Sequence, residues 1–121
     1  MNTTVASGVG NSLAVKQDGT VRAWGLNIYG QIGDGTTTGR CTPVHVRGLS
    51  GVVAVAAGHH YSLAVCSDGT VRAWGDNWYG QLGDGTTTRR SAPVQVRGLS
   101  GVVAVAGGWQ HSLALRSDGT V

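Results

Sequence analysis

Short β-prone runs separated by glycine-rich turns set the pattern of hydrophobic and polar positions along this chain. Residues 52–56 and 102–106 are unbroken runs of valine and alanine that end at glycines, a pattern typical of strands buried on both faces. The runs at 12–16 and 62–66 carry serine, leucine, alanine and valine and stop at a polar turn. Strong helix formers are scarce, and the pattern therefore predicts a chain of short β-strands.

Asp-Gly pairs follow these runs, at 18–19, 68–69 and 118–119. Asp-Gly between two short β runs is a strong hairpin signal, because a type I′ turn needs positive φ at both central residues. Return strands are then expected at 21–25 and 71–75, where they carry Trp24 and Trp74. A large apolar ring that recurs at a strand position is expected to be buried, so these two tryptophans are predicted to occupy equivalent buried sites.

Long glycine-rich segments follow the hairpins at 26–40 and 76–90, and both contain Tyr-Gly-Gln, Gly-Asp-Gly and three threonines. A loop of this length inside a compact repeat is either functional or packed as structure of its own. Because the framework is the same in both copies, we expect packing to be its main role. The remaining strands are expected at 3–7, 42–46 and 92–96, the last two with a proline at the start, where a missing N–H is tolerated.

These elements recur with a period of 50 residues. Residues 12–50 match residues 62–100 at 30 of 39 positions without a gap, and residues 101–121 start the unit again. Four short antiparallel strands repeated at this period are typical of the blades of a β-propeller. We therefore expect an all-β fold of antiparallel four-stranded blades in an incomplete ring, with two full blades and part of a third. The single repeat domain, 1–121, would divide into 1–50 with a truncated or degenerate start, a complete repeat at 51–100 and a truncated repeat at 101–121.

A longer motif runs through these repeats: Gly-x-x-[His/Tyr/Asn]-Ser-Leu-Ala, followed by Asp-Gly-Thr-Val-x-Ala-Trp-Gly-x-Asn-x-Tyr-Gly-Gln-[Ile/Leu]-Gly-Asp-Gly. In this motif the chain resembles a tandem of about two and a half regulator-of-chromosome-condensation repeats. In the complete copy the residues that carry the resemblance are Gly58, Ser62, Asp68, Gly69, Trp74, Gly75, Asn77, Gly80, Gln81, Gly83 and Gly85. The His-Ser pair typical of that family stands only at His111-Ser112, with Asn11 and Tyr61 at the corresponding positions of the other copies.

The resemblance implies a seven-bladed propeller and a binding role rather than one defined activity. Members of the family include a nucleotide exchange factor that binds chromatin, bacterial inhibitors of enzymes, and modules of larger signalling proteins. They share a rigid disc whose loops bind other proteins. The exchange activity belongs to loop residues spread around a complete ring, and this chain does not supply such a set.

Charge and cysteine content add little to these predictions of fold and function. The net charge is +3, but six of the nine basic residues are arginine pairs at identical repeat positions, which favours a role in the repeat itself over nucleic-acid binding. Cys41 and Cys66 stand at different repeat positions without metal-ligand spacing, so free thiols and a reducing compartment such as the cytoplasm are favoured. The first residues lack the pattern of a signal peptide, and no run is long enough for a membrane span.

Candidate chemistry is sparse. The histidines at 45, 59, 60 and 111 do not recur as a ligand set, and the Gly-Asp-Gly sequences lack the spaced ligands of a calcium loop. Ser12, Ser62 and Ser112 recur, which favours a framework hydrogen bond over three nucleophiles. We therefore predict no catalytic residue, no cofactor, no metal site and no enzyme activity.

Positions that differ between near-identical copies are not required by the blade itself. If the blades stack around an axis, these positions form arcs on one rim, and aromatic-rich turns of this kind are typical of protein-recognition surfaces. The predicted protein-binding rim consists of Asn11, Ile28, His59, His60, Tyr61, Trp78, Trp109, Gln110 and His111. Trp78 and Trp109 are expected to be largely exposed. The alternative interpretation is neutral variation on exposed loops.

These observations favour a non-enzymatic protein–protein interaction module, as a fragment of a longer repeat protein. Two alternatives stay open: a basic face that binds nucleic acid or chromatin, and a propeller fragment that self-associates through its open blade faces. Two blades and part of a third do not close a ring, because about seven blades of this period need roughly 350 residues.

Overall fold

The fold, in a computed structural model that describes residues 4–121, consists of β-strands joined by turns and loops. The first blade contains β1 (Val5–Ser7), β2 (Asn11–Val15), β3 (Val21–Gly25) and β4 (Arg40–His45). The second contains β5 (Val52–Ala57), β6 (Tyr61–Cys66), β7 (Val71–Gly75) and β8 (Arg90–Gln95), and the part-blade contains β9 (Val102–Gly107) and β10 (Ser112–Arg116).

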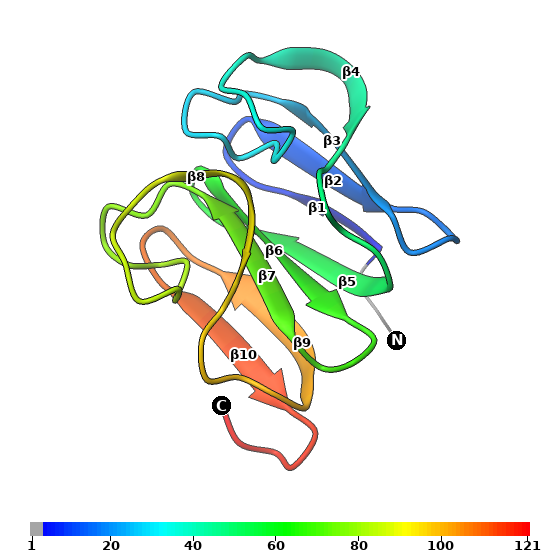
Figure 1. The fold of residues 1–121 in the computed structure, drawn as a ribbon, viewed down its shortest axis with the longest axis vertical. Helices are drawn as coiled ribbons and strands as arrows, with labels where there is room; N and C mark the ends of the chain where they lie inside the picture. The colour runs from blue at the N-terminus through cyan, green and yellow to red at the C-terminus, as the bar shows by residue number, and fades with distance from the viewer. Residues whose placement is uncertain (1–3) are drawn as a thin grey trace.

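Each sheet is an antiparallel meander, in which every strand pairs with its neighbours along the sequence. In Figure 1 the three sheets follow one another from the first blade at the top to the part-blade at the bottom. The architecture confirms the predicted all-β class, the four-stranded blades and the incomplete ring. The predicted strand at 3–7 begins at Val5 in the structure, and position 3 lies outside the described residues.

The two outer strands begin earlier than predicted. Because β4 starts at Arg40 and β8 at Arg90, Pro43 and Pro93 lie inside these strands and not at their starts. The register of β3 against β4 shifts between Ala23 and Gly25, so the ladder is interrupted close to the proline. An outermost strand with an interrupted ladder tolerates the missing N–H, because one side of the strand has no partner strand.

The hairpin turns differ from the predicted type I′. The amide of Gly19 donates to the carbonyl of Lys16 at 2.9 Å, and Gly19 has a φ of 79°. Within residues 4–121 the only non-glycine residue with positive φ is His60, so Asp18 does not adopt the conformation that type I′ requires. Its carboxylate instead accepts hydrogen bonds from the amide and hydroxyl of Thr20, at 3.0 and 2.6 Å. Asp-Gly therefore marks the hairpin correctly, but through a side-chain bond and one left-handed glycine.

The hydrophobic core lies between blades. Leu13 of the first blade packs in one buried cluster with Val55 and Trp74 of the second, and Leu63 of the second packs with Val102 of the part-blade. A fully buried side chain of this size contributes about 1.5–3 kcal/mol. Packing between neighbouring sheets is therefore the main source of stability, and a blade without a neighbouring blade leaves apolar surface exposed.

The part-blade shows this directly. In β9 and β10, Val103, Leu113 and Leu115 are exposed, whereas β5 is covered on both sides. The prediction of a strand buried on both faces is thus correct for 52–56 and wrong for 102–106. The reason is that the outward face of each blade is covered by the next blade, and none lies beyond β10 within residues 4–121.

Trp24 and Trp74 differ in burial, because only Trp74 has a neighbouring blade against it. They stand at the same register position, opposite Ser12 and Ser62 respectively. Trp74 is fully buried, and its indole Nε1 donates to the carbonyl of Gln31 in the preceding blade at 2.8 Å. Trp24 is only half-buried, because no blade precedes the first one within the described residues. The predicted burial is therefore correct for Trp74 and wrong for Trp24.

Candidate functional site

One end of the blades gathers the turns between inner strands together with the starts of the long loops. The amide of Leu26, at the start of the first loop, donates to the carbonyl of Gly10 in the first turn at 2.7 Å. In the second blade the amide of Asp76 donates to the carbonyl of His60 at 2.9 Å. The segments that vary between repeat copies therefore lie next to one another, and we call this end the rim: turns 8–11, 58–61 and 108–111, with loop residues 26–29 and 76–79.

A row of stacked rings runs along the rim across all three blades. The rings of His59 and Trp109 are parallel within 6°, with their centroids 4.0 Å apart. His59 in turn lies 4.0 Å from the ring of His60, tilted by 48°. The ring of His60 stacks on Tyr29 of the first blade at 4.9 Å. We call these four residues the aromatic row. Stacking joins turns that the β-ladders do not connect, and so holds the rim in one shape.

His60 occupies a strained backbone position. Its φ is 64°, and Gly10, at the corresponding position of the first blade, has a φ of 82°. A left-handed conformation costs a non-glycine residue about 1–2 kcal/mol. Burial, followed by the charge of neighbouring His59, lowers the pKa of His60 below its ordinary 6.5, although Asp76 opposes this. A neutral imidazole is therefore favoured within the stack near neutral pH.

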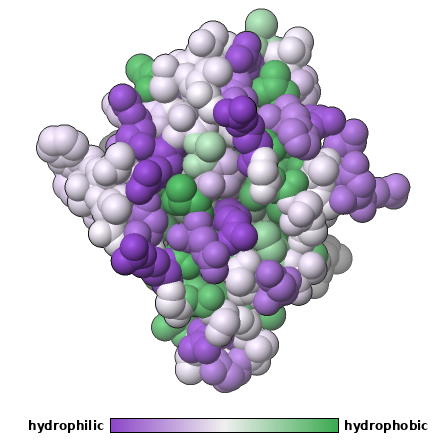
Figure 2. Space-filling model, viewed as in Figure 1, coloured by the Kyte–Doolittle hydropathy of each residue, from purple (hydrophilic) through white to green (hydrophobic). Residues whose placement is uncertain are grey.

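Exposed side chains lie at the end of the aromatic row and near it on the rim. Trp78 is 75% exposed and Trp109 is 67% exposed, as predicted, and Ile28 and Gln110 are also exposed. Arg89 donates to the main-chain oxygen of Ile28 at 3.3 Å and so ties the second loop to the first. Figure 2 shows that on the face it displays, hydrophobic residues form small separate groups among hydrophilic ones.

Two predicted rim residues are buried instead. Asn11 and Tyr61 are 2% and 0% exposed, so they do not belong to an exposed binding surface. Asn11 donates to the hydroxyl of Ser62 at 3.2 Å. The Tyr61 hydroxyl donates to the carbonyl of His111 and accepts from the amide of Gly108 at 2.9 Å. Each of these side chains connects its blade to the next one, so the position has a structural role between blades.

His111 is the third residue at this position. Its side chain is exposed, because within residues 4–121 no further blade follows. Its backbone, by contrast, accepts the bond from Tyr61, so the turn is held by the second blade. The exposure of its imidazole, in contrast to the burial of Asn11 and Tyr61, therefore depends on the neighbouring blade and not on the repeat position.

Comparison between repeat copies also missed two residues of the rim. Tyr29 belongs to the aromatic row, and Tyr79, at the same repeat position, is exposed. Because tyrosine occurs in both copies, a search for differences between copies does not find it. The Tyr-Gly-Gln motif was the available signal, since it places an aromatic ring at a fixed point of each loop.

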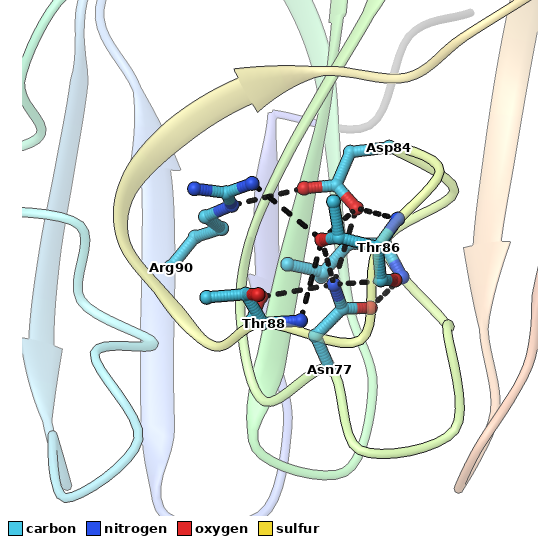
Figure 3. A network of polar contacts seen from close by, with 6 residues as sticks. Asn77, Asp84, Thr86, Thr88 and Arg90 are labelled. Carbon is cyan, nitrogen blue, oxygen red and sulfur yellow. Dashed lines mark hydrogen bonds and ion pairs between the residues drawn. The ribbon is translucent and has the colours of Figure 1, made fainter.

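The long loops that carry the rim are rigidly built. The side-chain amide of Asn77 donates to the carboxylate of Asp84 and to the carbonyls of Thr86 and Thr88, at 3.2, 3.1 and 2.9 Å (Figure 3). The other carboxylate oxygen of Asp84 accepts from Arg90 Nε at 2.9 Å. The same contacts recur in the first blade around Asn27. The packing role predicted for these segments therefore has a physical basis.

Asp84 is the charged centre of this network. Burial alone would raise the pKa of Asp84, but hydrogen bonds from Thr86, Arg90 and Asn77 outweigh it and hold the pKa at about 2. A carboxylate that accepts this many hydrogen bonds within the loop has little capacity left to coordinate another ligand. The network accounts for the Gly-Asp-Gly sequence as loop structure.

Other candidate groups are scattered. His45 on the outermost strand β4 contacts Arg22 on β3, and both cysteines are free thiols. In the part of the chain that the structure describes, no three His, Cys, Asp or Glu side chains converge as metal ligands. Nor is any helix there both long and apolar enough for a bilayer.

Family models match most of the chain. One model, described as the regulator of chromosome condensation (RCC1) repeat, matches residues 18–65 and 68–115. A second RCC1 repeat model matches residues 3–31 and 52–81. Among curated proteins, the E3 ubiquitin-protein ligases HERC2 of Homo sapiens and Mus musculus are each 51% identical over 47 residues. That match covers 39% of this chain and 1% of HERC2.

Solved structures agree with the family models. Human WBSCR16 superposes with a TM-score of 0.86 at 29% identity, over 95% of this chain and 30% of that one. Yeast RCC1 (Prp20) in its complex with Kap60 gives 0.79 at 28% identity, over 95% and 27%. Prp20p from Saccharomyces cerevisiae gives 0.83 at 22% identity, over 94% and 30%, which shows likeness of fold alone. This chain thus spans less than a third of each.

The repeat motif, the four-stranded blades packed face to face and the two matched repeats lead to one assignment. The chain belongs to the RCC1 repeat family of β-propeller proteins.

Proposed function

We propose that this chain is a non-enzymatic protein-interaction module that contacts a partner protein through its rim. The observation that carries the proposal is the aromatic row, which crosses three blades and ends at exposed Trp109. Trp and Tyr dominate binding energy at protein interfaces, because they bury a large area with few rotatable bonds. Exposed Trp78 and Ile28 extend the same surface.

Pre-organisation supports the proposal. The Asn77 and Asp84 network fixes the loop behind Trp78, and the stack fixes the turn that carries Trp109. A surface that is already ordered loses less conformational entropy on binding. Neutral variation on exposed loops does not require such ordering, so the stack favours recognition over neutral variation.

The relatives support protein partners as a class. Prp20p has binding properties to Gsp1p and histones, and yeast RCC1 (Prp20) binds Kap60. Those partners belong to those proteins, and only the class, another protein, is proposed for this chain. The uncovered blade faces at both ends further favour a role within a larger ring of blades. A longer repeat protein that contains the units 1–50, 51–100 and 101–121 remains a prediction.

The test compares partner binding by the native chain and by a Trp78→Ser, Trp109→Ser variant. Partners captured by the native chain are identified and titrated against both. We expect at least tenfold weaker binding by the variant, as for loss of an interface hot spot. Val103→Thr, on the exposed face of β9 away from the rim, is the matched control and should bind normally. Equal affinity for all three proteins would contradict the proposal.

A basic face that binds nucleic acid is the second candidate function. It is favoured by the net charge of +3 and by exposed Arg47 and Arg97, which pack on equivalent Gly-Asp-Gly turns. Phosphate contacts release counterions, so such binding weakens steeply between about 50 and 200 mM salt. We expect no binding to random duplex DNA at physiological salt. Tight binding with this salt dependence, lost in Arg47→Ala, Arg97→Ala, would favour the nucleic-acid function.

A further inference from the structure

Two adjacent histidines, His59 and His60, form the middle of the aromatic row, and we call them the histidine pair. The centroid of the His59 ring lies 4.0 Å from that of Trp109 and 4.0 Å from that of His60, and His60 stacks in turn on Tyr29. Histidine is the side chain whose ordinary charge change falls between about pH 5 and 8. The row therefore contains two groups that gain a charge in mild acid, at a separation where two positive charges repel each other strongly.

The surroundings of both rings favour their neutral form. The Nδ1 atoms of His59 and His60 are buried, and within residues 4–121 neither atom has a hydrogen-bond partner. A neutral imidazole can carry its one proton on Nε2, whereas a charged imidazole has an N–H on both nitrogens. Protonation would thus create a buried N–H donor without an acceptor in the row, and such a donor costs free energy.

Groups on other elements act on His60 in opposite directions. Burial, followed by the charge of His59, lowers the pKa of His60 below 6.5. The charge of Asp76 on the second long loop and the main chain of Val9 in the first turn oppose this lowering of the pKa. The negative charge of Asp76 balances one imidazolium in the pair, but it does not balance two.

Further cationic groups lie beside the row. Arg89 donates to the main-chain oxygen of Ile28, the residue before Tyr29. At the other end of the row, His111 belongs to the same turn as Trp109. Both groups are positive or become positive in acid, so they add to the repulsion that a doubly charged pair would meet.

Two main-chain hydrogen bonds connect the turn of the pair to its neighbours. The amide of His59 donates to the carbonyl of Gly108 in the part-blade at 3.1 Å, and the amide of Asp76 donates to the carbonyl of His60 at 2.9 Å. The turn itself is strained, because His60 has a φ of 64°. Loss of the stack would let this backbone relax, so strain favours opening of the turn once the rings repel each other.

We propose that the histidine pair makes the order of the rim depend on pH. With one proton or none on the pair, the stack holds turns 58–61 and 108–111 together, because a single imidazolium is attracted to the ring faces of Trp109 and Tyr29. With two protons, the rings separate, and turn 58–61 leaves its place against both aromatic neighbours. Because the rim is the surface proposed to bind a partner, this pH dependence rests on the proposed function.

The test uses the full chain without a partner. Hydrogen exchange of the His59 and Asp76 amides is followed from about pH 8 to about pH 4.5 and corrected for intrinsic exchange rates. We expect the protection of both amides to fall about tenfold or more toward the acid end. The amide of Val52, which donates to the carbonyl of Gly19 at the opposite end of the blades, should keep its protection. Asp84, whose pKa is about 2, stays ionised throughout and adds no change.

Two variants test whether both charges are needed. His59→Phe keeps an aromatic ring against Trp109, and His60→Asn keeps a residue that tolerates the left-handed backbone. Each variant leaves one titratable ring in the row, so the doubly charged state does not form. The protection of the Asp76 amide should therefore no longer depend on pH in either variant.

A histidine outside the row supplies the matched control. His45→Gln removes a titratable side chain from β4 and introduces the residue that the second blade carries at the same position, Gln95. This variant should lose its protection in acid as the native chain does. Circular dichroism near neutral pH checks that all variants fold.

Nuclear magnetic resonance titration of the His60 ring gives a readout that a purely structural role would not change. His60 should titrate at a lower pH in the native chain than in His59→Phe, because the charge of His59 lowers its pKa. Asp76→Asn should move the titration to a still lower pH, since the charge of Asp76 raises that pKa.

Three results would overturn this pH dependence: equal protection of the native amides at both ends of the pH range, acid opening that persists in either single variant, or the same His60 titration in the native chain and in His59→Phe. Any of them would leave the proposed function standing, because no partner takes part in these measurements. The Trp78→Ser, Trp109→Ser variant tests that function separately.

Discussion

The indole nitrogen of Trp74 lies 2.8 Å from the carbonyl oxygen of Gln31, which stands 43 residues earlier in the chain. The bond runs from the return strand of one blade into the loop of the blade before it. The hydroxyl of Ser62 bonds the same oxygen. The second blade is therefore anchored on the first through a tryptophan and a serine that the repeat supplies. The following predictions rest on this way of joining blades.

Trp74→Ala should destabilise the chain far more than Trp24→Ala, although both tryptophans stand in the same local sequence. Removal of a fully buried tryptophan costs about 3–5 kcal/mol. Trp24 is half-buried and packs on no preceding blade within the described residues, so its loss should cost about 1 kcal/mol. Urea unfolding followed by circular dichroism measures both. Equal losses would show that the inter-blade position does not decide the contribution of the ring.

Tyr61→Phe should weaken the joint between the second blade and the part-blade. The hydroxyl bonds the carbonyl of His111 and the amide of Gly108, and that amide also donates to the same carbonyl at 2.9 Å, so both backbone groups keep one partner when the hydroxyl is removed. A cost of about 0.5–1.5 kcal/mol follows, the net contribution of a hydrogen bond. Hydrogen exchange should become faster at Gly108. Tyr79→Phe is the matched control, since Tyr79 is exposed and should change stability very little.

His60→Gly should be more stable than His60→Ala, against the usual ranking of these residues in structured segments. Both variants lose the stack with Tyr29, but only glycine relieves the left-handed backbone, a difference of about 1 kcal/mol. Thermal unfolding measures it. At Gln110, which has no positive φ, alanine should be the more stable of the two. If alanine were also the more stable residue at position 60, backbone strain would have no part in the effect.

Asp84 should contribute stability that depends on pH. Its folded pKa, about 2, lies below the ordinary 3.8, so the folded state binds the proton less readily than the unfolded state does. The contribution is then complete above about pH 4, falls as pH is lowered, and is lost as pH passes through about 2. Asp84→Asn should therefore differ from the native chain near neutral pH and converge with it near pH 2. A constant difference across that range would exclude the ionised carboxylate as the cause.

Local sequence patterns by themselves determined where most strands of this protein form. The apolar runs and the Asp-Gly pairs predicted the strands, because each depends on residues close together in sequence, and the 50-residue period grouped these strands into blades. The exposure of Trp78 and Trp109 followed from comparison of the copies, since a blade that folds with isoleucine at position 28 does not need tryptophan at 78. Turn type was missed, because the Asp18 side chain competes for the turn amides in a way that the Asp-Gly pair alone does not show.

The tertiary structure decided which face each blade buries. Val-Arg-Ala-Trp-Gly occurs twice with the same strand pairing, yet Trp74 is buried and Trp24 is half-exposed, because the cover comes from the preceding repeat. Asn11 and Tyr61 varied between copies as a binding residue would, and only the packing of neighbouring sheets showed that they join blades. The stack of His59 on Trp109 likewise depends on two turns brought together by that packing. A repeat sequence determines its own local structure, while burial depends on whether a neighbouring repeat lies against it.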